Sequence, residues 1–589
     1  MVRLAAAAVA LVAVSAAATG AAGDIRAPCD SHIYCQGELL QAVQLAHVFG
    51  DDKEFVDRPT LRPAAQVLEA FGQLGANASR DALARFVEGN FGPAGAELRE
   101  AAIEGLDANP AFLGRVRDPL LRAFGREVNG YWGQLVRAQD LSVLCAGCES
   151  SMLELKHQFV VPGGRFREIY YWDTYFSLEG MLRSGLTVLA RESIQNLLDM
   201  VAAHGFVPNG ARVYYLGRSQ PPMLALMVKL YYGRTGDAAF VREALPLLQR
   251  EHQYWADRHS VEVQCGVNNE TLVLSRYYSD VDVPRPEAYA VDYQLAHNAS
   301  ATDTARHRQI YADMATGAES GWDYSTRWVR DPDAPGDRLL QTIRTRQVVP
   351  VDLNAILYQA EVAIAELADA TGARLPDNED YRTAASRRRR AMEHLLLDPE
   401  SALFGDYVLE EGGRRSGVSS AADLWPYWAF GAPPESVPRI AAQLERVLDA
   451  NRAGVPATLR HSGQQWDWPM AWPPLQYVAM QATLQLGRHD LALRIAQMFV
   501  DSVFCGWYTT GGSLPGVLAK LPGTADSGHI FEKYSSVDVG QPGGGGEYQV
   551  QPGFGWTNGV LLWALDLFGP QLRTPQCPGV ALRPAQRRG

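Results

Sequence analysis

The sequence has few cysteines, no excess of basic residues and no apolar run long enough to cross a membrane. Seven cysteines in 589 residues are too few for a disulfide-built scaffold. The apolar run at residues 4–14 is shorter than a bilayer-spanning helix, and the chain after Phe568 carries no hydrophobic tail. The formal net charge of −12 argues against a nucleic-acid partner, because phosphates would be repelled. We therefore expect no nucleic-acid partner and no membrane anchor in the mature chain.

Two short motifs that suggest a metal or a nucleotide lack essential parts. The C-x-x-C at Cys145 and Cys148 has no second ligand pair and no nearby histidine to complete a zinc site. The glycine run at 543–546 lacks the lysine and the spacing of a phosphate-binding loop. We therefore expect no metal site and no nucleotide cofactor.

The cysteine spacing bears on local cross-links. Two close pairs, Cys29 with Cys35 and Cys145 with Cys148, predict either local disulfides or inert thiols. The odd total leaves at least one of the remaining cysteines unpaired, and these are Cys265, Cys505 and Cys577.

The first residues have the pattern of a cleaved signal peptide. One arginine precedes the apolar run, and small residues follow it. We expect residues 1–22 to be removed and the protein to be secreted to the extracellular space. Three N-x-[ST] triplets, which also arise by chance, are compatible with a secreted glycoprotein, and they lie at Asn77, Asn269 and Asn298.

Helical patterns dominate the chain, and strand-like alternation is scarce. Residues 355–370, 475–486 and 559–568 carry apolar residues at helical spacing. Four segments run from an aromatic or polar loop into a helix, three of them through a proline near the first turn: 218–232, 346–360, 465–482 and 553–567. In a toroid of helical hairpins such loops converge at one end. The sequence therefore predicts an all-α fold with a site at one end.

Seven clusters combine the residue types that a sugar site needs. Aromatic faces pack on the C–H surface of a pyranose, charged or amide groups bind hydroxyls, and two carboxyls break the bond. A single cluster of this kind is common in protein cores, but seven together favour a carbohydrate site. They are residues 165–176, 208–220, 284–289, 319–328, 464–474, 532–534 and 543–558.

Two segments resemble the signatures of the trehalase family. Residues 162–175, PGGRFREIYYWDTY, match the pattern P-G-G-R-F-x-E-x-Y-x-W-D-x-Y at every fixed position. Residues 465–474, QWDWPMAWPP, match the second pattern, Q-W-D-x-P-x-[GAV]-W-[PAS]-P. Segments that begin at Cys35, Glu319 and Gly543 are also similar to the family, so the likeness covers nearly the whole mature chain.

The resemblance implies an (α/α)6 barrel that hydrolyses α,α-trehalose, a small disaccharide, to two glucose molecules with inversion and without a cofactor. The site residues are spread from 165 to 558, which favours one catalytic body over several domains. We expect the barrel at residues 151–570, with an N-terminal helical extension, residues 23–150, packed on it. Residues 571–589 would form a C-terminal tail.

The resemblance also implies roles for individual residues. Asp323 would be the general acid, and Glu532 the general base that activates water. The role of Glu547, which is similar to a carboxylate near the water site, is the least defined. The substrate-binding residues would be Arg165, Trp172, Asp173, Asn209, Arg218, Ser219, Gln220, Arg285, Pro286, Glu287, Gly321 and Glu547.

The chemistry of inversion sets requirements for the two carboxyl groups. They should lie about 6.5 to 9.5 Å apart, which leaves room for a water. Asp323 must be protonated, so we expect burial near Trp322 and Trp328 to raise its pKa. Glu532 must stay ionised beside a cation that the sequence does not identify. By residue type alone, Asp173 is an equal candidate for the acid and Glu547 for the base.

The sequence leaves two interpretations open for several other side chains. Arg165, Arg218 and Arg285 are expected to hold substrate hydroxyls and to bias the pKa of a neighbouring carboxyl, rather than only to brace loops. Asp467 either binds a hydroxyl or anchors its loop. The tryptophans that are equally candidates for cavity wall and for core are Trp172, Trp466, Trp472 and Trp556.

Two rival functions follow from the same features. A glucoamylase-like hydrolase of the same barrel class would act on α-glucan ends, but it leaves both trehalase signatures unexplained. A catalytically inactive sugar-binding protein would retain the pocket, but the intact candidates at Asp323 and Glu532 argue against it.

Overall fold

The computed structural model describes residues 25–75, 78–265, 270–336, 338–373, 380–410 and 413–585. The predicted signal peptide at residues 1–22 and the triplets at Asn77 and Asn269 lie outside the described residues, whereas Asn298 is exposed. In the described part of the chain, none of the helices has the length and apolar character that crossing a membrane requires.

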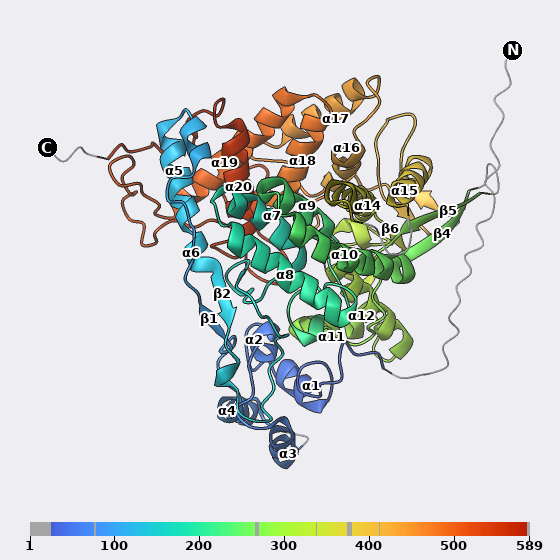
Figure 1. Ribbon diagram of the computed structural model, residues 1–589. Helices are drawn as coiled ribbons and strands as arrows, with labels where there is room; N and C mark the ends of the chain where they lie inside the picture. The colour runs from blue at the N-terminus through green and yellow to red at the C-terminus, as the bar shows by residue number, and fades with distance from the viewer. Residues whose placement is uncertain are drawn as a thin grey trace.

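Six helices form a closed inner ring among the described residues (Figure 1). Each packs against the next and the last packs against the first, in the order α7 (Tyr171–Arg183), α9 (Leu224–Thr235), α14 (Val351–Thr371), α16 (Trp425–Phe430), α18 (Pro473–Gln485) and α20 (Gly555–Phe568). The side chains of α7 are buried from Tyr171 to Leu182, as expected for a helix surrounded by others.

Six further helices form an outer layer around this ring. Five of them follow an inner helix in the chain, and the sixth, α5, precedes the ring and packs on α20. They are α5 (Pro119–Gly130), α8 (Thr187–His204), α10 (Ala238–His259), α15 (Tyr381–Leu395), α17 (Val437–Ala450) and α19 (His489–Thr509). This alternation of inner and outer helices confirms the predicted all-α (α/α)6 architecture.

The remaining helices are short or lie outside the two layers. They are α1 (Glu38–Leu45), α2 (Asp52–Val56), α3 (Ala64–Leu74), α4 (Arg80–Asn90), α6 (Trp132–Leu135), α11 (Tyr289–Ala299), α12 (Thr304–Glu319) and α13 (Arg338–Gln341). Helices α11 and α12 pack on each other. In the chain they lie between the second hairpin, α9 with α10, and the third, α14 with α15.

The strands form small antiparallel sheets that join loops rather than a central sheet. One has the order β1 (Leu98–Glu100), β2 (Val136–Gln139) and β3 (Phe159–Val160), and another has β6 (Val348–Val349), β7 (Tyr407–Val408) and β8 (Arg414–Arg415). Two hairpin-like pairs are β4 (Ser260–Cys265) with β5 (Glu270–Ser275), and β9 (Met470–Ala471) with β10 (Tyr534–Ser535).

The helices predicted from the sequence are all present. Residues 355–370 lie within α14, residues 475–485 within α18, and residues 559–568 form the end of α20. The four predicted loop-to-helix segments lead into α9, α14, α18 and α20, which are all members of the inner ring.

Two glycines allow α7 and α20 to approach closely. A Cβ atom at Gly559 would lie 2.0 Å from the carbonyl oxygen of Phe176, and one at Gly180 would lie 2.7 Å from Cα of Gly559. Any larger side chain at these positions would separate the two backbones. The contact closes the ring between its first and last helices.

The N-terminal segment has its own small apolar core and a buried ion cluster that joins it to the barrel. Lys53 Nζ lies 2.6 Å from Asp57 and 2.8 Å from Glu168. Arg212 Nη1 lies 2.7 Å from Glu97, and these side chains have no solvent exposure above 1%. The division of the chain at residue 150 stays a prediction. Helix α5 precedes this position in the chain, but it packs against α20 of the barrel.

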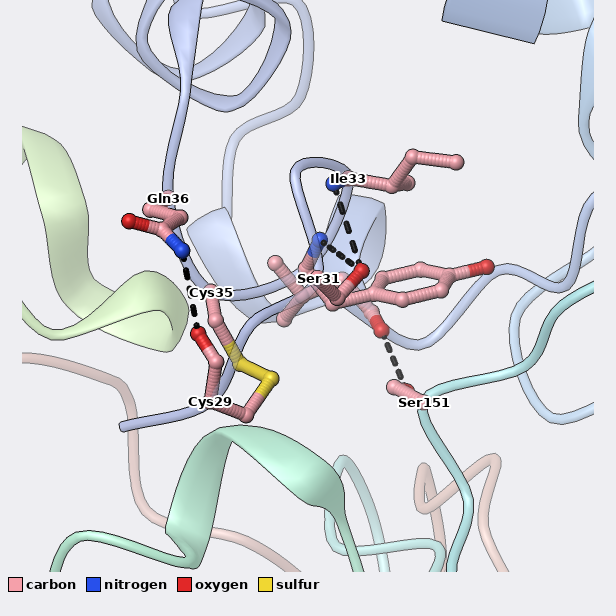
Figure 2. The surroundings of a disulfide bond; sticks show 8 residues. Cys29, Ser31, Ile33, Cys35, Gln36 and Ser151 are labelled. Atoms are coloured by element: carbon pink, nitrogen blue, oxygen red, sulfur yellow. Dashed lines mark hydrogen bonds between the residues drawn. A yellow bond between two sulfur atoms is a disulfide. The ribbon is translucent and has the colours of Figure 1, made fainter. Parts of the chain in front are cut away.

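Three disulfides are present among the described cysteines: Cys29–Cys35, Cys145–Cys148 and Cys505–Cys577. The two local pairs are therefore disulfides rather than inert thiols, and the third ties α19 to the C-terminal tail. Figure 2 shows the first, beside which the Gln36 amide donates to the Cys29 carbonyl at 3.4 Å. The side chain of Cys265 lies outside the described residues.

Removal of the Arg212 guanidinium tests the role of the buried cluster. Arg212→Met would leave Glu97 and Glu168 buried without this cation, so we expect the apparent free energy of unfolding to fall by about 3 to 5 kcal/mol. Urea denaturation followed by circular dichroism measures this change. Arg494→Met is the control, because this arginine pairs with Asp449 at the surface and its loss should change stability little. Equal stability of both variants would contradict the expectation.

Candidate active site

A cavity opens at the end of the inner ring where α7 and α20 begin. Its wall combines residues from the first turns of these helices with the loops that precede α9 and α18. Of the residues predicted to be catalytic or to bind substrate, the cavity is lined by Arg165, Trp172, Asp173, Asn209, Arg218, Gln220, Arg285, Glu287, Gly321, Asp323, Glu532 and Glu547.

Two predicted substrate-binding residues do not line the cavity. The Ser219 hydroxyl donates to the carbonyl of Val207 at 2.6 Å, and its backbone N–H donates to Glu319 at 2.9 Å. Pro286 is buried, and its carbonyl accepts a hydrogen bond from the Gln44 amide at 2.8 Å. Both residues therefore brace the loops that carry their neighbours.

Asp323 lies in the loop after α12 and has an uncommon backbone conformation. Its φ of 37° is in the left-handed region, which is unfavourable for a residue with a Cβ atom. Gly321, just before it, has a φ of 71°, and a Cβ there would lie 2.9 Å from the Trp172 ring. This tight turn presents the Asp323 carboxyl to the cavity, where Oδ2 accepts a hydrogen bond from the Gln465 amide at 3.0 Å.

Burial and, next to it, the negative charge of Glu547 raise the pKa of Asp323 to about 7, against the lowering effect of Arg285 and Arg218. The carboxyl group is therefore mostly protonated below about pH 7, far above the range in which an ordinary aspartate keeps its proton. Trp322 and Trp328, expected to desolvate it, do not line the cavity, because both pack against the guanidinium of Arg327.

Glu532 lies in the loop after α19, and its carboxyl group accepts two hydrogen bonds. The Tyr548 hydroxyl donates to Oε1 at 2.8 Å, and the backbone N–H of Gln551 donates to Oε2 at 3.4 Å. Burial raises the pKa of Glu532, whereas the positive charge of Lys533 and the Tyr548 hydrogen bond lower it. Lys533 is thus the principal cation near this carboxyl, with Arg165 a further one.

Each of the three arginines in the wall pairs with a carboxylate. Arg165 Nε donates to Asp51 at 2.7 Å, at the N-cap of α2. Arg218 Nη2 lies 2.5 Å from Glu287.

Arg285 is held from two sides. Its Nη2 lies 2.6 Å from Asp292 of α11 and 2.7 Å from Glu547. The Glu547 charge is therefore compensated by a direct ion pair, whereas neither Asp323 nor Glu532 forms one with a described cation.

Asp173 is a third buried carboxyl in the wall and lies in the first turn of α7. Burial raises its pKa well above the ordinary value, and the charges of Glu532 and Asp323 raise it further. By its pKa alone, Asp173 thus remains as suitable for proton donation as Asp323.

The four tryptophans considered for the wall all line the cavity, and they also pack on one another. Trp466 and Trp472 stack with ring centroids 3.8 Å apart, and Trp172 and Trp556 meet edge to face at 5.9 Å. The four tryptophans therefore belong both to the cavity wall and to the packed core. Such a rigid aromatic surface suits the apolar face of a sugar ring.

Asp467 anchors its loop and does not line the cavity. It accepts hydrogen bonds from the Ser325 hydroxyl, the Thr326 N–H and the Thr458 hydroxyl at 2.7 to 2.8 Å. These bonds tie the second signature segment to the loop that carries Asp323. Of its two interpretations, the structure supports the anchor.

Two buried polar atoms of the wall have no hydrogen-bond partner among the described residues. They are Oε2 of Glu287 and Nε1 of Trp466, an acceptor and a donor. Buried polar groups are normally paired, so unpaired ones in a cavity indicate where ligand hydroxyls or water would bind.

Sequence reasoning missed several residues that build the site. Phe166, Tyr170, Tyr215, Tyr548 and Phe554 complete the aromatic wall, and Ala318 also lines it. All except Ala318 lie inside the clusters of aromatic and charged residues described above, so the clusters carried the signal. Asp51, Gln465 and Lys533 act behind the wall and were not distinguished from ordinary polar residues.

Comparisons with known proteins agree with this site. The sequence profile of the trehalase family matches residues 47–569. A trehalase from Oryctolagus cuniculus is 37% identical over 575 residues, which cover 94% of this chain and 94% of that protein. A periplasmic trehalase from Xanthomonas campestris is 36% identical, with 93% of this chain and 88% of that protein covered.

A solved structure supports the fold independently. The neutral trehalase from Saccharomyces cerevisiae superposes with a TM-score of 0.53 at 22% identity, and the match covers 69% of this chain and 73% of that one. The family profile and the relatives cover the toroid and every residue of the cavity wall. The chain therefore belongs to the trehalase family.

Proposed function

We propose that this protein hydrolyses α,α-trehalose to two glucose molecules with inversion, using Asp323 as general acid and Glu532 as general base. The observation that carries the proposal is a cavity lined by tryptophans and paired arginines, in which Asp323 and Glu532 are buried without ion-pair partners among the described residues. Membership of the trehalase family supports a glycoside hydrolase that acts on this disaccharide.

In this mechanism, protonated Asp323 donates its proton to the oxygen that bridges the two glucose units. Glu532 accepts a proton from a water that attacks the anomeric carbon from the opposite face. The raised pKa of Asp323 supports the first role. The expected separation of about 6.5 to 9.5 Å between the two carboxyl groups stays a prediction.

The choice of Glu532 over Glu547 rests on their different partners. Glu547 is bound directly to Arg285, and a carboxylate held in such a pair is a weaker base. Glu532 accepts hydrogen bonds from a neutral hydroxyl and an amide, which leaves it free to take a proton from water. We assign Glu547 to substrate binding and to raising the pKa of Asp323.

The choice of Asp323 over Asp173 rests on the family likeness and on position. Asp173 lies in the first turn of α7, and burial raises its pKa although the helix dipole there opposes the shift, so protonation alone does not separate it from Asp323. Asp323 lies on a strained loop and accepts a side-chain amide, an arrangement that positions a reacting group.

Substrate binding is assigned to the other lining residues. The unpaired Glu287 oxygen would accept a sugar hydroxyl, and the forks of Arg218 and Arg285 would hold others. Trp172 and Trp556 would pack on the sugar rings. Ser219 and Pro286 would support these positions from behind.

We also propose that the protein is exported, as the predicted signal peptide implies. The three disulfides support an oxidising compartment, since such bonds are rare in the cytosol. Glycosylation at Asn298, which is exposed at the end of α11, stays a proposal.

Activity on disaccharides tests the proposed function directly. The purified protein should release glucose from trehalose and not from maltose or sucrose. Asp323→Asn and Glu532→Gln should each reduce kcat by about 10² to 10⁴-fold, because each removes one proton-transfer group. Asp257→Asn on the exposed face of α10 is the control and should be fully active. Hydrolysis of maltose or starch instead would favour the glucoamylase-like function, and binding without turnover would favour a sugar-binding protein.

The stereochemistry of the first turnover tests inversion. Inversion at one anomeric carbon of α,α-trehalose yields one α-glucose and one β-glucose. Proton NMR recorded before mutarotation should show the two anomers in equal amounts. Formation of α-glucose alone would mean retention and would exclude the proposed mechanism.

The pH profile tests the two protonation states. The rate should rise as Glu532 loses its proton and fall as Asp323 loses its own near pH 7. Glu547→Gln removes a negative charge that raises the pKa of Asp323, so the alkaline limb of kcat/KM should move to lower pH. An alkaline limb that stays in place or moves upward would contradict the assignment.

A further inference from the structure

Lys533 differs from the other cations near the cavity because it forms no ion pair with any described carboxylate. The arginines are held by Asp51, Glu287, Asp292 and Glu547. Lys533 Nζ donates instead to the Gln465 amide oxygen at 3.0 Å and to the carbonyl of Gly545 at 3.4 Å. Its charge also lies 4.8 Å from the centre of the Trp472 ring. The Lys533 side chain is completely buried, and burying an ammonium without a paired carboxylate is energetically unfavourable.

Gln465 links this ammonium to the proposed general acid. Its Oε1 accepts from Lys533, and its Nε2 donates to Oδ2 of Asp323 at 3.0 Å. The Trp472 indole donates to the Gln465 carbonyl at 2.8 Å, so the backbone of this residue is fixed. The pairing of β9 with β10 holds the two loops side by side.

The chemistry of the ammonium determines how the amide is oriented. A lysine ammonium carries three donors and no acceptor, so it can face only the oxygen of the Gln465 amide. The NH₂ group must then point the other way, toward Asp323. A flipped amide would place two donors against each other and would leave the buried ammonium with only the distant carbonyl of Gly545 as an acceptor.

We propose that Lys533 and Gln465 are positioning residues that determine which oxygen of Asp323 carries the transferable proton. The inference rests on the proposed role of Asp323. Because Oδ2 accepts the amide N–H, the proton resides on Oδ1, and after transfer the same N–H stabilises the carboxylate that remains. On Asp323, Lys533 acts through Gln465 and does not contact the substrate; its charge separately lowers the pKa of Glu532.

The surroundings of both residues agree with this role. A Cβ atom at Gly546 would lie 2.5 Å from Oε1 of Gln465, so the glycine run leaves room for the amide. Burial lowers the pKa of Lys533, and the charges of Glu532 and Asp323 oppose this by favouring its protonated form. The charged groups with the largest effect on the pKa of Asp323 are Glu547, Arg285, Arg218 and Glu532.

The test compares Lys533→Met, Gln465→Met and the double variant. Each single change removes the fixed donor, so kcat on trehalose should fall about 10 to 100-fold while KM changes less than about threefold. The double variant should lose little more than Lys533→Met alone, since the two residues act in series on Asp323. The loss should be smaller on α-glucosyl fluoride, because fluoride leaves without a proton. Lys520→Met, at an exposed lysine, is the control.

A measurement independent of turnover completes the test. The ¹³C carboxyl resonance of Asp323, assigned with Asp323→Asn, should titrate at higher pH in both single variants, because each loses a donor that favours the carboxylate. An unchanged titration in Lys533→Met, or an unchanged kcat and alkaline limb, would overturn the proposal. If the unmodified protein did not cleave trehalose, the proposed function would fail while this titration still decided the role of Lys533.

Discussion

The pairing of buried charges is the constraint on which the site depends. Several carboxyls and cations, most of them buried, share one cavity, and an unpaired charge there is unstable. Arg218 therefore lies against Glu287, and Arg285 against Asp292 and Glu547. Three carboxyls, Asp173, Asp323 and Glu532, remain without an ion-pair partner among the described cations, and burial raises the pKa of each. Among them, the family likeness and the position in the fold favour Asp323 and Glu532 for the proposed chemistry.

This constraint explains why segments outside the ring contribute to the site. Asp51 at the start of α2 compensates Arg165, and Asp292 of α11 compensates Arg285. Neither acid lines the cavity. The N-terminal segment is in turn fastened to the barrel by the buried cluster around Lys53 and Arg212. A toroid of hairpins alone would therefore not supply the countercharges that keep the wall arginines in place.

Much of this arrangement could be predicted from the sequence, because aromatic and charged residues gather at the starts of helices. The loops before α9, α14, α18 and α20 were predicted to lie at one end of a helical array, and residues before α9 and α18 and in the first turn of α20 line the cavity. Contacts between distant loops were not predictable. Residue type does not show that Lys533 meets Gln465, that Asp467 anchors the loop of Asp323, or that Cys505 pairs with Cys577. Ser219 and Pro286 show the converse, since residues adjacent to a wall position in the chain need not face the cavity.

The site also carries a conformational free-energy cost, and the close packing of the ring offsets it. Asp323 has a left-handed backbone, and such a residue costs of the order of 1 to 3 kcal/mol unless its surroundings hold it. Its surroundings are rigid: Gly321 lies against Trp172, Asp467 fastens the following residues, and α7 meets α20 through glycines. A looser scaffold would let the turn relax and would turn the Asp323 carboxyl away from the cavity. The rigidity of the aromatic and helical packing is therefore what keeps the proposed acid protonated, buried and directed at the substrate.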